Sequence, residues 1–275
     1  TIYAYISDGG VQEEISQGAG RVAGTLGLGN LVMFYDANDI QLSTECDTVS
    51  TEDTELKYKA WGWHVITIDG NDCEQIRNAL DESKTVNDRP VLIIGKCIMG
   101  KGARTADNQC YERSCKTHGA PLGGDAFTNT VKNLGGDPEN PFVIFDDVKE
   151  MYAKRAEELK AIVAERHAEE NAWAASNAEK AQLLKDWFDN KLPELPWDEI
   201  QQAANAPTRN ASAACLTMLS KHVKNMIVSS ADLCNSDKTD GFIKGGATVI
   251  TRDNFAGGFL QAGVAELTMA CVCIG

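Results

Sequence analysis

The sequence lacks features that define several large classes of protein. No apolar run approaches the length of about 20 residues that a membrane span needs, and no charged-then-apolar signal pattern opens the chain. Basic residues are in deficit: 26 Lys and Arg face 40 Asp and Glu, a formal net charge of −14. A nucleic-acid-binding surface would be basic, so nucleic acid is not an expected partner. The sequence favours a cytoplasmic protein that engages neither nucleic acid nor membrane.

Close pairs of cysteines are also missing. The nine cysteines are scattered and form no CxxC pair. A disulfide framework or a zinc knuckle needs tighter spacing, so we expect reduced thiols. The chain has no initiator Met, begins inside a strand-like run and ends in an apolar helical pattern. We therefore expect that further protein chain belongs at both ends.

What is present is an alternation of strand and helix patterns, typical of an α/β protein. β-prone runs at 2–6, 30–36, 61–69 and 89–97 are separated by helical patterns, including one over 12–26. Short β-branched runs separated by helices predict a parallel sheet with right-handed crossovers. In such sheets, ligands bind at the carboxyl ends of the strands.

The second half of the chain predicts a helical linker and a second α/β domain. A charged helical pattern begins at Val148, and the prolines in the segment "LPELPWDE" (192–199) end a further helix. We expect domains at 1–147 and 207–275, joined by a helical linker at 148–206. The last domain is predicted to contain a helix at 208–223, strands at 225–230 and 247–251, and a final helix from about Gly257.

The stretch "ISDGG" places Asp8 between a strand and two glycines, and Asn38 follows the next predicted strand 30 residues later. Both then lie at the carboxyl ends of neighbouring strands. A carboxylate, an amide oxygen and a backbone carbonyl are hard ligands that suit Mg²⁺ or Ca²⁺, and diphosphate oxygens and water would complete the coordination. Gly9 and Gly10 leave space for phosphates. Singly, Asp8 is better explained as a helix cap and Asn38 as a turn residue; the pair favours a metal–diphosphate site.

The segment "SDGGVQEEISQGAGRVAGTLGLGNLVMFYDANDI" resembles the diphosphate-binding segment of the transketolase family of thiamine-diphosphate enzymes. "YKAWGWHVITIDGND", "THGAPLGG", "APTRNAS", "SSADLCNS" and "QAGVAELTMA" match further family stretches in the family's order, leaving out mainly the helical linker. Two departures stand out. Ser7 replaces the first glycine of the commoner "GDG", and Ala265 and Leu267 replace Arg and His of the commoner "GVREHGM". Neither removes an inferred ligand.

This resemblance implies a set of cofactor and metal ligands. Asp8, the side chain of Asn38 and the backbone carbonyl of Ile40 would bind Mg²⁺. Gly9 would lie against the diphosphate of thiamine diphosphate, and Glu13 near the contact between two subunits. All five positions fall within the best-matching segment of the chain.

It also implies residues for the substrate and for the cofactor rings. His118 would be a catalytic residue that faces the cofactor phosphates and the substrate, while Arg209 and Ser236 would hold a sugar phosphate. Asp232 would lie beside the thiazolium ring. Glu266 would be a buried catalytic glutamate, bonded to the aminopyrimidine so that an ylide can form. Taken alone, His118 is more often structural, Arg209 a surface residue, and Glu266 only a carboxyl with a perturbed pKa.

The function that the resemblance implies is reversible transfer of a two-carbon ketol unit from a ketose phosphate to an aldose phosphate, in the pentose phosphate pathway. Residues 1–147 would bind diphosphate and metal, and residues 207–275 would begin the pyrimidine-binding domain. A homodimer with sites between subunits is expected, and the isolated chain is expected to lack full activity. Two alternatives remain: another thiamine-diphosphate sugar enzyme, such as dihydroxyacetone synthase or deoxyxylulose phosphate synthase, or a non-catalytic truncated paralogue that acts as an assembly subunit.

Overall fold

The computed structural model describes residues 1–275, which divide into two compact units. The larger unit comprises Thr1–Pro138 and Ile200–Gly275, and the smaller unit comprises Glu139–Glu199. The strands, all in the larger unit, are β1 (Ile2–Ser7), β2 (Leu31–Ala37), β3 (His64–Asp69), β4 (Val91–Lys96), β5 (Val228–Ser230) and β6 (Phe259–Gln261). Its helices are α1 (Asp8–Gln12), α2 (Glu14–Leu26), α3 (Thr54–Ala60), α4 (Cys73–Ser83), α5 (Gly124–Asn133), α8 (Thr208–His222), α9 (Cys234–Asp237), α10 (Gly241–Lys244) and α11 (Glu266–Ile274).

The main sheet has the strand order β1-β2-β4-β3, and every pair is parallel. This confirms the predicted α/β fold with a parallel sheet flanked by helices. Ser7 at the end of β1 pairs with Asp36 near the end of β2, and Asp36 pairs with Gly95 of β4. The carboxyl ends of the three strands therefore meet at one edge of the sheet, where the residues after β1 and β2 are neighbours.

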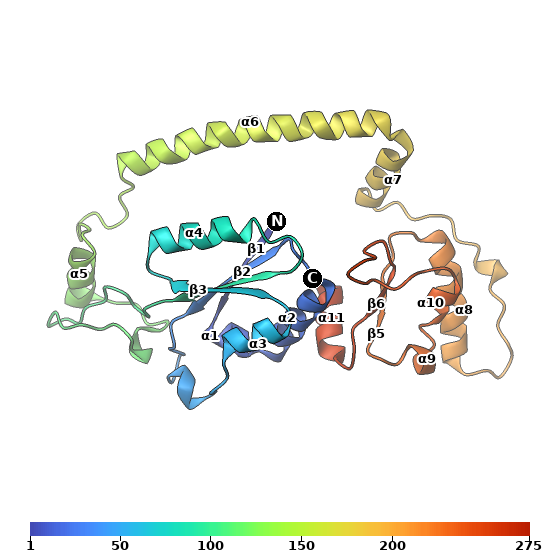
Figure 1. Cartoon of the computed structure of the whole chain (residues 1–275), viewed down its shortest axis with the longest axis horizontal. Helices are drawn as coiled ribbons and strands as arrows, with labels where there is room; N and C mark the ends of the chain where they lie inside the picture. Colours follow the sequence, from blue (N-terminus) through green and yellow to red (C-terminus); the bar gives the residue numbers. More distant parts are fainter. The chain divides into compact units, whose positions relative to one another are not determined.

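The core lies on both faces of this sheet, and β4 supplies its centre. Leu92 and Ile94 face a cluster that includes Tyr58 of α3, whereas Val91 and Ile93 face a cluster that includes residues of α4. Figure 1 shows α1 to α3 on one side of the sheet and α4 on the other. A parallel strand buried on both faces is apolar along its whole length, as the run Val91–Ile94 is.

The helix predicted over 12–26 begins earlier and is broken in two. Asp8 is itself the first residue of α1, whose N-cap is Ser7, so Asp8 is not the N-cap. Glu13 has an extended backbone (ψ 129°) between α1 and α2, and this single residue changes the direction of the chain. The break lets α1 stay short beside the sheet edge while α2 packs along the sheet. The helix then ends at Gly27, whose left-handed φ of 63° suits glycine.

The predicted order of elements near the C-terminus is partly wrong. Residues 247–251 form isolated bridges, not a strand, and the strand that pairs with β5 is β6, inside the region predicted as helix. Phe259 of β6 is fully buried against Val228 and Phe242, and this packing outweighs the β-branched character of the earlier run. The final helix consequently starts at Glu266, not near Gly257.

The smaller unit consists of α6 (Asp146–Ser176), α7 (Ala178–Phe188) and a short 3₁₀ turn (Trp197–Glu199). The predicted boundaries of the two domains and of the linker between them stay predictions. No helix of the chain combines the length and apolar character needed to cross a membrane.

Candidate functional site

Asp8 lies buried at the carboxyl end of β1, with its carboxylate held by three donors. The Tyr35 hydroxyl donates to Oδ1 at 2.6 Å, and the backbone N–H groups of Asn38 and Asp39 donate to Oδ2, each at 3.1 Å. The side chain is only 3 % exposed. Burying a charged carboxylate is costly unless hydrogen bonds compensate, so these three contacts explain how Asp8 is kept at this position.

Asn38 is fixed beside Asp8 by contacts at both ends of its side-chain amide. Its Nδ2 donates to Asp36 Oδ1 at 3.2 Å, and its Oδ1 accepts from the Ile40 backbone N–H at 3.1 Å. Asn38 and Ile40 follow β2 on either side of Asp39, whose φ is +65°. The predicted proximity of Asp8 and Asn38 is therefore observed, and the strand pairing is its cause.

The oxygen atoms at this edge fit a hard divalent cation. Asp8 Oδ1 and Asn38 Oδ1 each accept a single hydrogen bond, and the Ile40 carbonyl accepts none from the backbone. Each of these oxygens has two lone pairs, so each retains acceptor capacity. Nowhere do three or more His, Cys, Asp or Glu side chains gather as a ready-made metal site. A cation at this edge would take mixed carboxylate, amide and carbonyl ligands, as Mg²⁺ accepts.

Two cavities open on either side of Asp39. The first, of about 490 Å³, is lined by Asp8, Gln12 and Tyr35 among others. The second, of about 380 Å³, is lined by Asn38, Ile40, Glu45 and Arg113. Asp39, Cys46 and Asp47 line both cavities. The buried carboxylate and the neighbouring amide thus border space that a ligand can enter.

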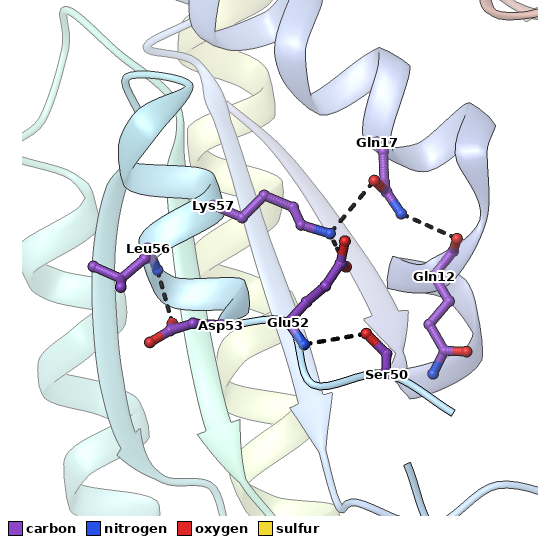
Figure 2. Close-up of polar contacts among 7 residues, drawn as sticks. All are labelled: Gln12, Gln17, Ser50, Glu52, Asp53, Leu56 and Lys57. Atoms are coloured by element: carbon purple, nitrogen blue, oxygen red, sulfur yellow. Dashed lines mark hydrogen bonds and ion pairs between the residues drawn. The ribbon is translucent and has the colours of Figure 1, made fainter. Parts of the chain in front are cut away.

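A chain of polar contacts joins the wall of the first cavity to the break between α1 and α2 (Figure 2). Lys57 of α3 forms an ion pair with Glu52 and donates to Gln17 Oε1 at 3.4 Å. Gln17 Nε2 in turn donates to the carbonyl oxygen of Gln12, the last residue of α1, at 3.1 Å. Asp53 caps α3 by accepting from the Leu56 N–H at 2.9 Å. These contacts hold α1, and so Asp8, against the loop that closes the cavity.

Burial and nearby carboxylates raise the pKa of three groups around Asp8. Burial first, and then the hydrogen bond to Asp8, raise the pKa of the Tyr35 hydroxyl, so it stays a donor at every working pH. Burial and then the charge of Asp8 raise the pKa of the Cys46 thiol to about 11. Burial and the hydrogen bond to Asp36 raise the pKa of the Cys97 thiol to about 12.

These shifts predict slow alkylation of Cys46 and Cys97. At pH 8 we expect Cys46 to react with iodoacetamide roughly 100-fold more slowly than an unburied thiol. A pKa that is two units higher lowers the fraction of reactive thiolate by about that factor. Exposed Cys73 is the internal reference, and peptide mass spectrometry gives the rates. Asp8→Asn should speed alkylation of Cys46 more than that of Cys97. Equal rates at Cys46 and Cys73 would contradict this electrostatic description.

The remaining predicted residues of the larger unit's first half lie near this edge without joining the cluster. A Cβ added at Gly9 would meet nothing within 4 Å, so a ligand has room to approach the backbone there. Glu13 is exposed at the helix break. His118 is half-buried after a 3₁₀ turn (Cys115–Thr117), and its buried Nδ1 has no hydrogen-bond partner. Gly119, with a φ of +71°, turns the chain directly after it.

Four predicted residues lie outside both cavities. Arg209, the second residue of α8, is exposed; Asp232 is exposed with a φ of +65°, and Ser236 is exposed on α9. The expectation that Glu266 is buried is wrong for this chain alone. Glu266 is the first residue of α11, and its side chain points from that helix end into solvent.

Sequence reasoning missed three residues of this site: Tyr35, Lys57 and Arg113. Tyr35 could have been found from the strand pairing, because Ile6 of β1 pairs with Tyr35 of β2, which brings its hydroxyl to Asp8, the residue that follows β1. No sequence pattern indicated Lys57 or Arg113, since the position of each side chain depends on contacts between residues that are distant in the sequence.

Comparison with known proteins gives a consistent result. Residues 1–193 match the family model for the transketolase thiamine diphosphate binding domain. Transketolase from Nostoc sp. is 32% identical over 99% of this chain, and chloroplastic transketolase-1 of Arabidopsis thaliana is 33% identical over the same share. The chain spans 40% and 36% of their lengths.

Solved structures agree with the sequence comparison. Transketolase from Leishmania mexicana superimposes with a TM-score of 0.89 at 27% identity, covering 98% of this chain and 40% of that one. A transketolase from Pichia stipitis does so with a TM-score of 0.87 at 28% identity and the same coverage. The chain belongs to the transketolase family.

Proposed function

We propose that this chain binds thiamine diphosphate through Mg²⁺ at the shared edge of β1 and β2. The observation that carries the proposal is the buried Asp8 carboxylate, which accepts a hydrogen bond from the Asn38 backbone N–H. Acceptor capacity is left on Asp8 Oδ1, on Asn38 Oδ1 and on the Ile40 carbonyl. The family match to a thiamine diphosphate binding domain supports the identity of the ligand. All three ligands are hard oxygens, which suit Mg²⁺, with Ca²⁺ as the alternative.

In this proposal each residue at the edge has one task. Asp8 and Asn38 bind the metal through side-chain oxygens, and Ile40 through its carbonyl. Tyr35 keeps the carboxylate oriented by donating to Oδ1. Gly9 leaves room for phosphate oxygens. When bound, the cofactor would supply an electron sink for cleaving a carbon–carbon bond next to a carbonyl.

Replacing Gly9 with alanine separates a binding role from a folding role. No atom lies within 4 Å of the added Cβ, so Gly9→Ala should leave the thermal midpoint unchanged. The methyl group would occupy space needed by the diphosphate, so affinity for Mg²⁺ and thiamine diphosphate should fall about 10-fold or more, a loss of roughly 1.4 kcal/mol. Calorimetry and thermal melting measure the two effects. Unchanged affinity would place the phosphates elsewhere.

The substrate proposal is a ketose phosphate donor and an aldose phosphate acceptor, exchanging a two-carbon ketol unit as in the pentose phosphate pathway. Pichia stipitis transketolase structures contain fructose 6-phosphate and sedoheptulose 7-phosphate. Here we propose that Arg209 and Ser236 bind the sugar phosphate and that His118 contacts both cofactor and substrate. The unpartnered Nδ1 of His118 supports that role, because a buried ring nitrogen without a partner is uncommon.

We further propose that the site is completed by a second copy of the chain in a homodimer. Asp232 and Glu266 are exposed and lie outside the cavities that Asp8 and Asn38 line, which fits residues that serve a cofactor held by another subunit. Glu266 would hold a proton at the aminopyrimidine of the cofactor. All nine cysteines are free, which supports a reducing, cytoplasmic location.

A donor and acceptor panel tests the reaction. Fructose 6-phosphate and a sedoheptulose or xylulose phosphate are offered with an aldose phosphate, thiamine diphosphate and Mg²⁺. Transfer that is lost in Asp8→Ala would support the transketolase reaction, and transfer of the two-carbon unit to formaldehyde, which forms dihydroxyacetone, would favour the alternative sugar enzyme. Cofactor binding without transfer by the chain alone is the result we expect. A folded chain that binds no thiamine diphosphate would contradict the proposed function.

A further inference from the structure

Arg113 is brought to the second cavity by a closed loop between β4 and α5. The Arg113 N–H donates to the Met99 carbonyl at 2.9 Å, which ties the end of the loop to its beginning. Glu112 accepts from the Gly102 N–H at 2.7 Å, and Tyr111 N–H donates to the Ala103 carbonyl at 2.9 Å. Three successive residues are thus anchored, so the position of Arg113 on the cavity wall is fixed by the backbone.

Arg113 is exposed, and its guanidinium is unpaired although three carboxylates line the same cavity. Asp39, Glu45 and Asp47 line the same cavity, yet Arg113 forms no ion pair or side-chain hydrogen bond with any of them. If its role were to neutralise these carboxylates, a direct pair would be expected. An arginine has five N–H donors in a planar fork that matches phosphate oxygens. Its donors are free, and they border the cavity that contains Asn38 and Ile40.

The backbone of Arg113 adds a second, independent observation. Its φ is +54°, in the left-handed region that favours glycine and disfavours side chains with a Cβ. The Arg113 side chain forms no hydrogen bond or ion pair that would compensate for this conformation. A residue held in a sparsely populated conformation beside a cavity points to a role for its side chain in that cavity.

We propose that Arg113 is a cofactor-binding residue that donates to the terminal phosphate of the diphosphate. This rests on the proposed function and extends it from the metal ligands to the anion itself. Asp39, Glu45 and Asp47 give this cavity a strongly negative lining, Asp8 lines the adjoining cavity, and a diphosphate adds further negative charge. In the proposed complex Mg²⁺ offsets part of this charge, and Arg113, which lines the same cavity, supplies a further positive charge.

The test compares four variants of the full chain by calorimetric titration with Mg²⁺ and thiamine diphosphate, and with Mg²⁺ and inorganic diphosphate. Arg113→Met should lower both affinities roughly 10- to 100-fold, the range for a lost hydrogen bond between charged groups. Arg113→Lys, which keeps the charge without the fork, should lose less. Lys116→Met is the matched control, because Lys116 is exposed on the same loop, lines neither cavity and carries the same charge.

Arg113→Gly separates binding from folding. Glycine adopts a φ of +54° without strain, so this variant should keep or raise the thermal midpoint while losing affinity as Arg113→Met does. A fall in midpoint together with affinity would mean a structural role and overturn the inference. So would wild-type affinity in Arg113→Met, or an equal loss in Lys116→Met. If the wild-type chain bound no thiamine diphosphate, the proposed function would fail and this inference with it; binding that is indifferent to Arg113 overturns the inference alone.

Discussion

Asp8→Ala is expected to abolish Mg²⁺-dependent binding of thiamine diphosphate, a loss of at least about 100-fold in affinity. Asp8 is the one carboxylate among the three proposed ligands, so its removal takes away the only negative charge that contacts the metal directly. Asn38 and Ile40 would offer two neutral oxygens, which bind Mg²⁺ weakly against water. Titration of the chain at fixed Mg²⁺ measures the loss.

The Asp8 experiment needs a control for folding, because the carboxylate also accepts three hydrogen bonds. Its removal leaves the Tyr35 hydroxyl and the N–H groups of Asn38 and Asp39 without a partner, so some loss of stability is expected. Asp8→Asn keeps the shape, and Tyr35→Phe keeps the carboxylate while removing one donor. Both variants should remain folded, but only Asp8→Asn should lose most of the Mg²⁺ dependence. Wild-type Mg²⁺ dependence in Asp8→Asn would exclude Asp8 as a ligand.

Leu92→Ala should destabilise the larger unit by about 3 kcal/mol, the middle of the range for deleting a buried leucine. Leu92 is fully buried on the central strand β4, where it pairs with Met33 of β2 and Val65 of β3. The cavity left by truncation cannot collapse easily, because strands flank it on both sides. Denaturant unfolding followed by circular dichroism measures the change.

Leu42→Ala is the matched control for Leu92→Ala, since Leu42 is 67% exposed. It should change the free energy of unfolding by less than about 0.5 kcal/mol. Under conditions where both variants are folded, their affinity for Mg²⁺ and thiamine diphosphate should match wild type, because neither residue touches the proposed ligands. A stability loss in Leu92→Ala no greater than in Leu42→Ala would contradict the assignment of β4 to the core.

The sheet edge could be predicted from the sequence because its cause is local and periodic. Apolar runs of strand length locate β1, β2 and β4, and the 30 residues between Asp8 and Asn38 fit one strand–helix–strand unit. Parallel pairing then makes their carboxyl ends neighbours. The break at Glu13 could not be predicted, because the helical pattern continues through it and the extended backbone depends on how α1 and α2 each meet the sheet.

Long-range packing explains the other differences. The β-branched run at 247–251 has the composition of a strand, but Phe259 occupies the buried position beside Val228. Whether Glu266 is buried depends on what covers α11, which no pattern within one chain reveals. The left-handed backbone of Arg113 is set by the closed loop, since arginine itself gives no signal for that conformation. In none of these cases can the deciding contact be read from the local sequence pattern.

The central claim is that Asp8, Asn38 and Ile40 form a metal site that binds the diphosphate of thiamine diphosphate. Its most direct test is calorimetric titration of the purified chain with thiamine diphosphate, with Mg²⁺ and with the metal removed by a chelator. We predict saturable binding with Mg²⁺ and none without it, restored when Mg²⁺ is added back. Binding that is equal with and without metal, or no binding by a chain shown to be folded, would contradict the claim.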